Sequence, residues 1–191
     1  MIGGKHMNSF SHKILTKDIQ AFYYLNTRIK SQILNKIMLL ITHLGGAFFT
    51  ILLAILCILI KPGFNPIIGW EIILVLSSSH LFVHIIKRLI NRQRPHVKLN
   101  NIELLVDPFE PYSFPSGHTT ASFSVALILS FYLPILSPVL LTLALLVAIS
   151  RVYLGVHYPL DILFGVIIAV IFVIIIHYGL YYYIERYLLE F

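Results

Sequence analysis

Histidine, aspartate and arginine lie close together in the segment SRVYLGVHYPLD, between two strongly apolar stretches of the chain. His157 and Asp161 are four residues apart, a spacing that puts two side chains on one face of a helix. A carboxylate bound to one imidazole nitrogen fixes the tautomer and leaves the other nitrogen free as a nucleophile or base. Arg151 would point away from His157 on one continuous helix, so we expect Gly155 and Pro159 to bend the chain. A surface turn between two helices is the alternative interpretation.

A second polar group stands in the segment FPSGHTTASFSVA, directly before an apolar stretch. Ser116 is a residue type that caps helix N-termini, and Gly117 allows another group to approach the backbone closely. The free N–H groups and the dipole of a helix that begins here would bind an anion. His118, in the first turn, could donate a proton to a leaving group. The alternative is an ordinary helix start with a histidine at the membrane interface.

Two cations, Lys87 and Arg94, stand seven residues apart in the segment KRLINRQRP. We expect them to share one helix face, about 10 Å apart, with Pro95 ending the helix at Arg94. Two fixed cations at a helix end can hold an anion such as phosphate. The alternative is that both side chains only extend from the membrane core to its polar interface.

The three segments together supply what phosphoryl transfer needs without a metal ion: cations that neutralise charge, a nucleophile and a proton donor. His80 and His84 also have a spacing that can bind metal, but the sequence offers no third ligand near them. We therefore predict that they are polar residues facing the interior of a helix bundle. His43 and His96 are candidates for the substrate entrance.

The composition predicts a membrane protein. Of the 191 residues, 58% are hydrophobic and 12% are charged, and the mean hydropathy is +0.87; soluble domains are about 25% charged. The net charge of +6 favours a lipid surface or an anionic substrate over nucleic acid in a chain this apolar. We expect one membrane-embedded domain over residues 1–191, with Cys57 packed as a small apolar residue.

Hydrophobic runs separated by turn residues predict an all-α transmembrane bundle of about five spans. An N-terminal segment, 1–36, precedes the transmembrane core at 37–184, and its residues 14–36 have the spacing of an amphipathic helix in the interface. The expected spans are 37–60, 67–86 with a helical extension toward Asn91, 118–134, 137–150 and 160–184, and the longest loop is 92–117.

With this topology all the unusual polar groups fall on one side of the membrane. The N-terminal segment, the long loop and the turn 151–159 face that side, whereas the turns at 61–66 and 134–137 and the C-terminus face the other. We therefore expect the candidate residues from three separate segments to converge at one membrane face. Glu71 and His177 lie toward the opposite face, where we expect an interfacial carboxylate and a packed imidazole.

Taken together, the motifs K-x6-RP, PSGH and SR-x5-H-x3-D resemble the three-part signature of the type-2 phosphatidic acid phosphatase and vanadium haloperoxidase superfamily. The resemblance covers roughly residues 37–180. It implies that His157 attacks phosphorus to form a phosphohistidine and that His118 protonates the leaving oxygen. It also implies no metal ion and no cofactor. The implied residues are catalytic His157, His118 and Asp161, and phosphate-binding Lys87, Arg94, Ser116, Gly117 and Arg151.

The leading hypothesis is an integral-membrane lipid phosphatase, because a site at the interface reaches a headgroup whose tails stay in the bilayer. Undecaprenyl diphosphate and phosphatidylglycerol phosphate are the expected substrates, with phosphatidic acid possible. The alternatives are a vanadate-dependent haloperoxidase, whose relatives are larger and soluble, and a non-catalytic lipid-binding or transport protein.

The family resemblance and the charge distribution disagree on orientation in the plasma membrane. The resemblance implies that the site faces the extracytoplasmic side. Twelve of the 14 lysines and arginines, however, fall on the site's side, and the positive-inside rule places such a side in the cytoplasm. We keep the extracytoplasmic placement as the expectation.

Overall fold

The computed structural model describes residues 9–60 and 65–188, and over these residues the protein is helical apart from loops and one isolated bridge between Gln93 and Tyr112. The elements in chain order are α1 (Ser9–Tyr23), the π-helical turn η1 (Tyr24–Arg28), α2 (Gln32–Thr42), the 3-10 turn η2 (His43–Gly45), α3 (Ala47–Leu59), α4 (Pro66–Ile90), α5 (Pro95–Lys98), α6 (Gly117–Tyr132), the 3-10 turn η3 (Pro134–Leu136), α7 (Ser137–Tyr153) and α8 (Pro159–Leu188).

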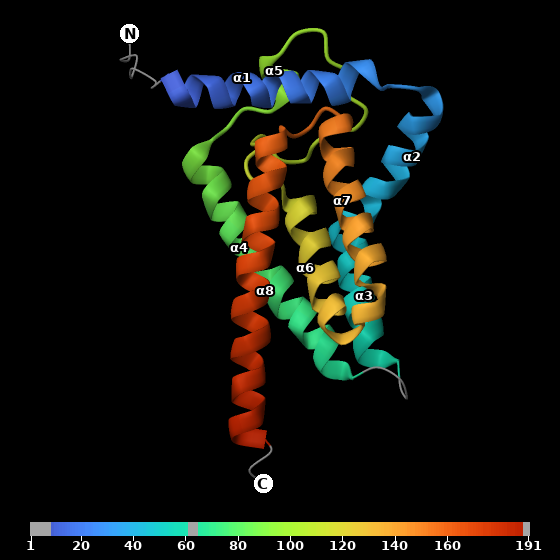
Figure 1. Cartoon of the computed structure of the whole chain (residues 1–191), viewed down its shortest axis with the longest axis vertical. Coiled ribbons are helices and arrows are strands. Elements are labelled where there is room, and N and C mark those ends of the chain that lie inside the picture. Colours follow the sequence, from blue (N-terminus) through green and yellow to red (C-terminus); the bar gives the residue numbers. More distant parts are fainter. Residues whose placement is uncertain (1–8, 61–64, 189–191) are drawn as a thin grey trace.

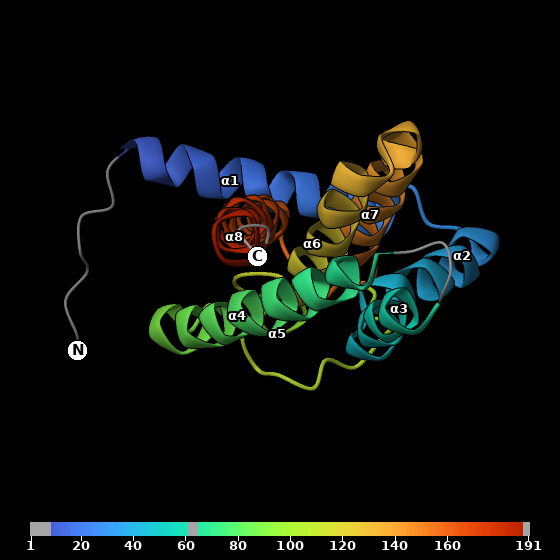
Figure 2. The ribbon, with the colours of Figure 1, turned by 90° about the horizontal axis from the view of Figure 1, so that it is seen from below.

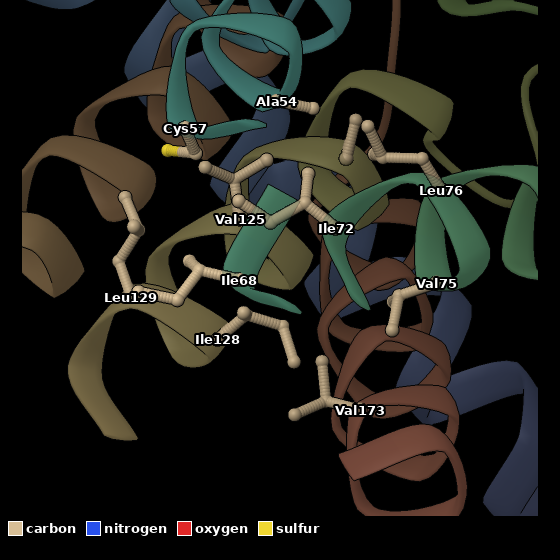
Figure 3. Packing of buried hydrophobic residues seen from close by; sticks show 11 residues of the cluster. Ala54, Cys57, Ile68, Ile72, Val75, Leu76, Val125, Ile128, Leu129 and Val173 are labelled. Carbon is tan, nitrogen blue, oxygen red and sulfur yellow. The ribbon is translucent and has the colours of Figure 1, made fainter. Parts of the chain in front are cut away.

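Helix α6 is the centre of the bundle, and α3, α4, α7 and α8 pack around it (Figure 1 and Figure 2). Figure 3 shows the main apolar cluster, in which Ile72 of α4, Ile128 of α6 and Val173 of α8 meet. Small residues on α6, such as Ala121 and Ser124, are buried and allow the neighbouring helices to approach closely. This packing fixes the end of α6 that carries the PSGH motif.

Within the described part of the chain, three helical segments are long and apolar enough to cross a membrane: Pro66–Ile90, Pro134–Tyr153 and Pro159–Gly179. The pair Gln32–Gly45 and Ala47–Leu59 passes the same test as one segment, although it is bent by 50°. Many large apolar side chains on the outside of these helices are exposed, as Ile171 and Ile175 of α8 illustrate. Such a surface suits contact with lipid.

Residues 37–60, expected as the first span, do not run as one straight helix but fall within the bent pair of α2 and α3. Helix α2 already begins at Gln32, where the Ser31 hydroxyl caps it by accepting a hydrogen bond from the Leu34 N–H at 3.1 Å. The break follows Gly45. A Cβ atom there would lie 2.8 Å from the His118 carbonyl oxygen, so this glycine lets η2 pack directly against the start of α6.

The N-terminal amphipathic helix lies across the end of the bundle that carries the predicted site residues (Figure 1). Its predicted extent, 14–36, is wrong at the C-terminal end, because the helical run stops at Arg28 and residues 32–36 belong to α2. Asp18, Phe22 and Asn26 are spaced by four, and all three are buried. This stripe therefore faces the bundle.

Glu71, expected at the membrane interface, is instead 1% exposed between helices. Its Oε2 lies 3.1 Å from Nδ1 of His177 on α8, and the His177 ring stacks on Phe131 of α6. A partner 106 residues away thus supplies the hydrogen bond that the burial of Glu71 requires.

Candidate active site

A cavity of about 450 Å³ lies at the end of the bundle near α1 and receives side chains from most of the elements there. Six of the eight predicted site residues line it: Lys87, Arg94, Gly117, His118, Arg151 and His157. The other two, Ser116 and Asp161, are fully buried behind this lining. The predicted convergence of the three motifs is therefore confirmed as geometry.

Arg151 and His157 meet because the chain bends sharply between α7 and α8. Gly155 has a φ of +86°, and a Cβ atom at this position would lie 2.8 Å from the Glu103 carbonyl oxygen. The N–H groups of Val156 and His157 then both bond to the Arg151 carbonyl at 3.2 Å. The bend predicted from Gly155 is confirmed.

Arg94 reaches the cavity from the loop and not from the face of α4. The helix ends at Ile90, because Asn91 adopts a left-handed conformation at its C-cap, and Arg94 itself is extended. The expectation that Lys87 and Arg94 share a helix face is therefore wrong. Hydrogen bonds from Arg94 to the carbonyl oxygens of Val156 at 2.9 Å and Glu110 at 2.7 Å hold its guanidinium in place instead.

His157 and Asp161 also lie differently from the prediction, since His157 precedes α8 and only Asp161 belongs to that helix. His157 Nδ1 is 3.5 Å from Asp161 Oδ2, slightly longer than an ordinary N–H···O hydrogen bond. His157 Nε2 lies 3.4 Å from Nη1 of Arg94. The ring thus turns one nitrogen toward the carboxylate and the other toward the cations.

The surroundings of His157 favour its neutral form. Burial lowers the pKa of His157 well below its usual value near 6.5, and the cations Arg94, Arg151 and Lys87 lower it further. A neutral imidazole with one nitrogen directed at a carboxylate has its lone pair on the other nitrogen. Such a nitrogen can attack an electrophile held among the three cations.

The PSGH motif forms the predicted helix start. The Ser116 hydroxyl accepts a hydrogen bond from the Thr119 N–H at 3.4 Å and another from the Thr119 hydroxyl at 3.0 Å. Ser116 thus caps α6 and does not line the cavity, whereas Gly117 and His118 do. The N-terminus of α6 therefore opens onto the cavity, where N–H groups and the helix dipole favour an anion.

Two residues of the site were not predicted as ligands. Thr42 is buried, and its hydroxyl accepts a hydrogen bond of 2.7 Å from Nη1 of Arg151. Glu110, in the long loop, forms an ion pair with Lys87. The sequence signals were a threonine within an apolar span and a glutamate in the loop between the K-x6-RP and PSGH motifs. Neither signal indicates which residue the side chain contacts.

The remaining histidines are divided around the cavity. His43 and His80 line it, and His96 lies beside it in a neighbouring pocket. His84 Nδ1 is 3.6 Å from Glu110 Oε1. Across residues 9–60 and 65–188 no three His, Cys, Asp or Glu side chains gather in a group that could hold a metal ion.

Comparison with known proteins finds relatives of one superfamily. The model of the PAP2 superfamily matches residues 68–185. Phosphatidylglycerophosphatase B of Bacillus subtilis is 34% identical over 151 residues, which are 72% of this chain and 70% of that protein. The putative undecaprenyl-diphosphatase of Escherichia coli is 47% identical over 96 residues, 50% of this chain and 44% of that protein. The chain spans about half the length of several curated relatives that it matches.

Solved structures agree. The crystal structure of a transmembrane PAP2-type phosphatidylglycerolphosphate phosphatase from Bacillus subtilis superposes with a TM-score of 0.74 at 28% identity, covering 95% of this chain and 90% of that one. The family model matches well over half of the chain. Phosphatidylglycerophosphatase B aligns over most of both proteins and supports the same assignment. The chain belongs to the PAP2 superfamily.

Proposed function

We propose that this protein is an integral-membrane lipid phosphatase, with one membrane-embedded catalytic domain. The observation that carries the proposal is that three cations line one cavity together with His118 and His157. A phosphate is opposite in charge to the side chains of Lys87, Arg94 and Arg151. Charge-assisted hydrogen bonds from such side chains to a phosphate are strong. The two imidazoles supply a nucleophile and an acid for transfer of that phosphate.

A lipid substrate is supported by an apolar groove that continues from the polar cavity. The groove has a volume of about 390 Å³ and runs between α3 and α4, where Ile51, Ile55 and Ile73 line it. Ala47 and His80 line both the groove and the cavity. A molecule with a phosphorylated head in the cavity and a hydrocarbon tail in the groove would satisfy both surfaces.

In the proposed first step, Nε2 of His157 attacks phosphorus and the bond from phosphorus to the leaving oxygen breaks. Asp161 stabilises the cationic phosphohistidine through Nδ1. His118 enters this step as an imidazolium and gives one proton to the departing oxygen, which leaves the ring neutral. In the second step water attacks the phosphohistidine, His118 takes a proton from that water, and inorganic phosphate leaves with His157 restored. The developing negative charge on the phosphoryl oxygens is met by the three cations and by the N-terminus of α6.

Phosphatidylglycerol phosphate and undecaprenyl diphosphate are the proposed substrates. The first is supported by the relative from Bacillus subtilis that aligns over most of its length, and the second by the one from Escherichia coli. Both lipids carry a terminal phosphoryl group that a cavity of about 450 Å³ can hold.

The proposed topology has five spans, with the bent pair α2–α3 as the first and the short α6 as the third. Helix α6 has 16 residues and is enclosed by its neighbours, so it needs less apolar length than a lipid-facing helix. We place the site on the extracytoplasmic side of the plasma membrane. Five of the twelve cations counted against this placement are bound within the protein: Lys30, Lys87, Arg92, Arg94 and Arg151.

The orientation is testable with a protease-accessible tag at either terminus of the protein in intact cells. Extracytoplasmic placement with five spans predicts cleavage of the N-terminal tag and protection of the C-terminal one. The opposite pattern would overturn it.

The function is tested by phosphate release from the purified protein in detergent, with phosphatidylglycerol phosphate, undecaprenyl diphosphate and phosphatidic acid compared. We expect release from at least one lipid, unchanged by EDTA, and a loss of about a thousandfold or more in His157→Ala. Equal turnover in His157→Ala would overturn the mechanism. Binding of lipid without release from any of the three would favour a non-catalytic role.

A further inference from the structure

The carboxylate of Asp161 is held mainly by groups other than His157. Its Oδ1 accepts a hydrogen bond of 2.7 Å from Nη1 of Arg92, and its Oδ2 accepts one of 2.8 Å from the Tyr158 N–H. His157 Nδ1, at 3.5 Å, is the most distant of these three neighbours. The position of the orienting carboxylate is therefore set by its other partners.

Arg92 bridges two carboxylates. Its second terminal nitrogen, Nη2, lies 2.5 Å from Oδ2 of Asp18 on α1, and its guanidinium stacks on the Tyr158 ring at 3.9 Å. The planar guanidinium suits this arrangement, because its terminal nitrogens can donate to different acceptors while the face stacks on an aromatic ring. Arg92 thus connects α1 to the first turn of α8.

Asp18 is buried, with a side chain that is 1% exposed. Its second oxygen, Oδ1, accepts a hydrogen bond of 2.8 Å from the Leu160 N–H in the first turn of α8. Asp18 therefore caps α8 from a different helix and pairs with Arg92 at the same time. Burying ionised groups is costly, so a buried ion pair such as Asp18–Arg92 need not stabilise the fold. Its charges do, however, act on the nearby site.

The charges of the three groups have a direct consequence for His157. Arg92 alone would cancel the negative charge of Asp161 and weaken its attraction for a cationic imidazole. Asp18 neutralises Arg92, so the three groups together keep one net negative charge beside Nδ1. Arg94, Arg151 and Lys87 face His157 as cations, and the His118 ring is also near. The net negative charge beside Nδ1 of His157 thus depends on Asp18 as well as on Asp161.

We infer that Asp18 is a positioning residue of the active site, acting through Arg92 to hold Asp161 in place and to preserve its charge toward His157. This rests on the proposed roles of His157 and Asp161. It also makes the N-terminal helix part of the catalytic architecture. Phe22 packs on the Tyr158 ring with centroids 5.7 Å apart, and Nδ2 of Asn26 donates to the Tyr153 carbonyl at 2.9 Å.

Asp18→Asn separates this role from a structural one. The asparagine oxygen can still accept from the Leu160 N–H, but the charge is gone. We expect kcat to fall about tenfold, the lower end of the loss seen when a metal-binding histidine loses its orienting partner, with KM within about twofold of the original. The acid limb of the kcat/KM profile should move to lower pH, because removing a nearby negative charge makes the imidazole harder to protonate.

Three comparisons make the test decisive. Lys17→Gln removes an exposed charge next to Asp18 and should leave kcat and the pH profile unchanged. In an Arg92→Gln background, Asp18→Asn should have no further effect on kcat, because its influence passes through Arg92. If Asp18→Asn does not fold, Arg92→Lys tests the bridge instead, since an ammonium cannot reproduce the fork, and the same loss of kcat is expected.

The inference is overturned if Asp18→Asn keeps the original kcat and pH profile while His157→Ala is inactive. Full additivity of Asp18→Asn and Arg92→Gln would also overturn it, because Asp18 would then act independently of Arg92. Activity retained in His157→Ala would instead count against the proposed mechanism, so the two failures are distinguishable.

Discussion

Glu110 forms an ion pair with Lys87 inside the cavity, so a carboxylate of the long loop is bound to a cation that the proposed mechanism gives to the substrate phosphate. Arg94 also donates to the Glu110 carbonyl at 2.7 Å, which holds this part of the loop over the site. A phosphate that enters must therefore displace the Glu110 side chain.

Glu110→Gln should bind phosphate more tightly. A half-exposed ion pair is worth about 1 kcal/mol, so we expect KM for the lipid and the inhibition constant of inorganic phosphate to fall roughly fivefold at pH 7. Glu103→Gln, which removes an acid paired with Lys30, is the matched control and should change neither constant. A rise of KM in Glu110→Gln would show that Glu110 supports Lys87 and does not compete for it.

The difference between Glu110→Gln and the original protein should depend on pH. Partial burial raises the pKa of Glu110, but Lys87, Arg94 and His84 outweigh this and leave that pKa below its usual value. Glu110 is then ionised at neutral pH, and its competition is lost only as the pH falls through the lowered pKa. The two KM values should therefore stay apart down to about pH 5, since an ordinary glutamate has a pKa of about 4.3.

Thr42→Val should weaken phosphate binding by releasing Arg151. The Thr42 hydroxyl is the acceptor of a 2.7 Å hydrogen bond from the Arg151 guanidinium, and valine keeps the shape but removes the acceptor. We expect KM to rise roughly fivefold or more, the cost of about one hydrogen bond to a charged group. Thr142→Val is the control, because the Thr142 hydroxyl donates to the Pro138 carbonyl one turn earlier in its own helix, α7. Equal KM values in both variants would contradict the role of Thr42.

The convergence of the motifs was predictable because it follows from two local properties. The residue types and spacing within each motif, as in Ser116 to His118, indicate its chemistry. The number of spans between motifs determines which membrane face each motif reaches. Gly155 was also informative, since a glycine between an arginine and a histidine implies a bend. These features need no knowledge of contacts between distant residues.

The details that failed depend on such distant contacts. Pro95 was expected to end the helix that carries Lys87 at Arg94, but Asn91 caps this helix earlier, and Arg94 is then positioned by carbonyl groups of other segments. Likewise Asp18 looks like one charge on an amphipathic helix, and only the folded chain places it against Arg92. Helix propensity and hydrophobic periodicity describe one segment by itself, whereas Asp18 and Arg92 are 74 residues apart.

Arg94→Gln should shift the pH dependence of the reaction. Burial is the main cause of the lowered pKa of His157, and Arg94 is the first of the cations that lower it further. Removing this cation should raise the pKa of His157, so the acid limb of kcat/KM should move to higher pH even though total activity falls. The substrate phosphate titrates identically in both proteins, so the difference belongs to the enzyme. Arg88→Gln, an exposed charge on α4, should leave the limb in place; an unmoved limb in Arg94→Gln would contradict the assignment.

The Glu71 and His177 pair should support stability and not catalysis, because it lies at the other end of the bundle from the cavity. Glu71→Ala leaves the partly buried His177 ring without its 3.1 Å partner on α4. Hydrogen bonds between membrane helices are worth about 1 kcal/mol, so we expect the Tm in detergent to fall by about 2–4 °C, with kcat and KM unchanged. Ser78→Ala is the control, since the Ser78 hydroxyl donates to the Leu74 and Val75 carbonyls of α4 itself. A fall in kcat without a fall in Tm would show instead that this pair communicates with the active site.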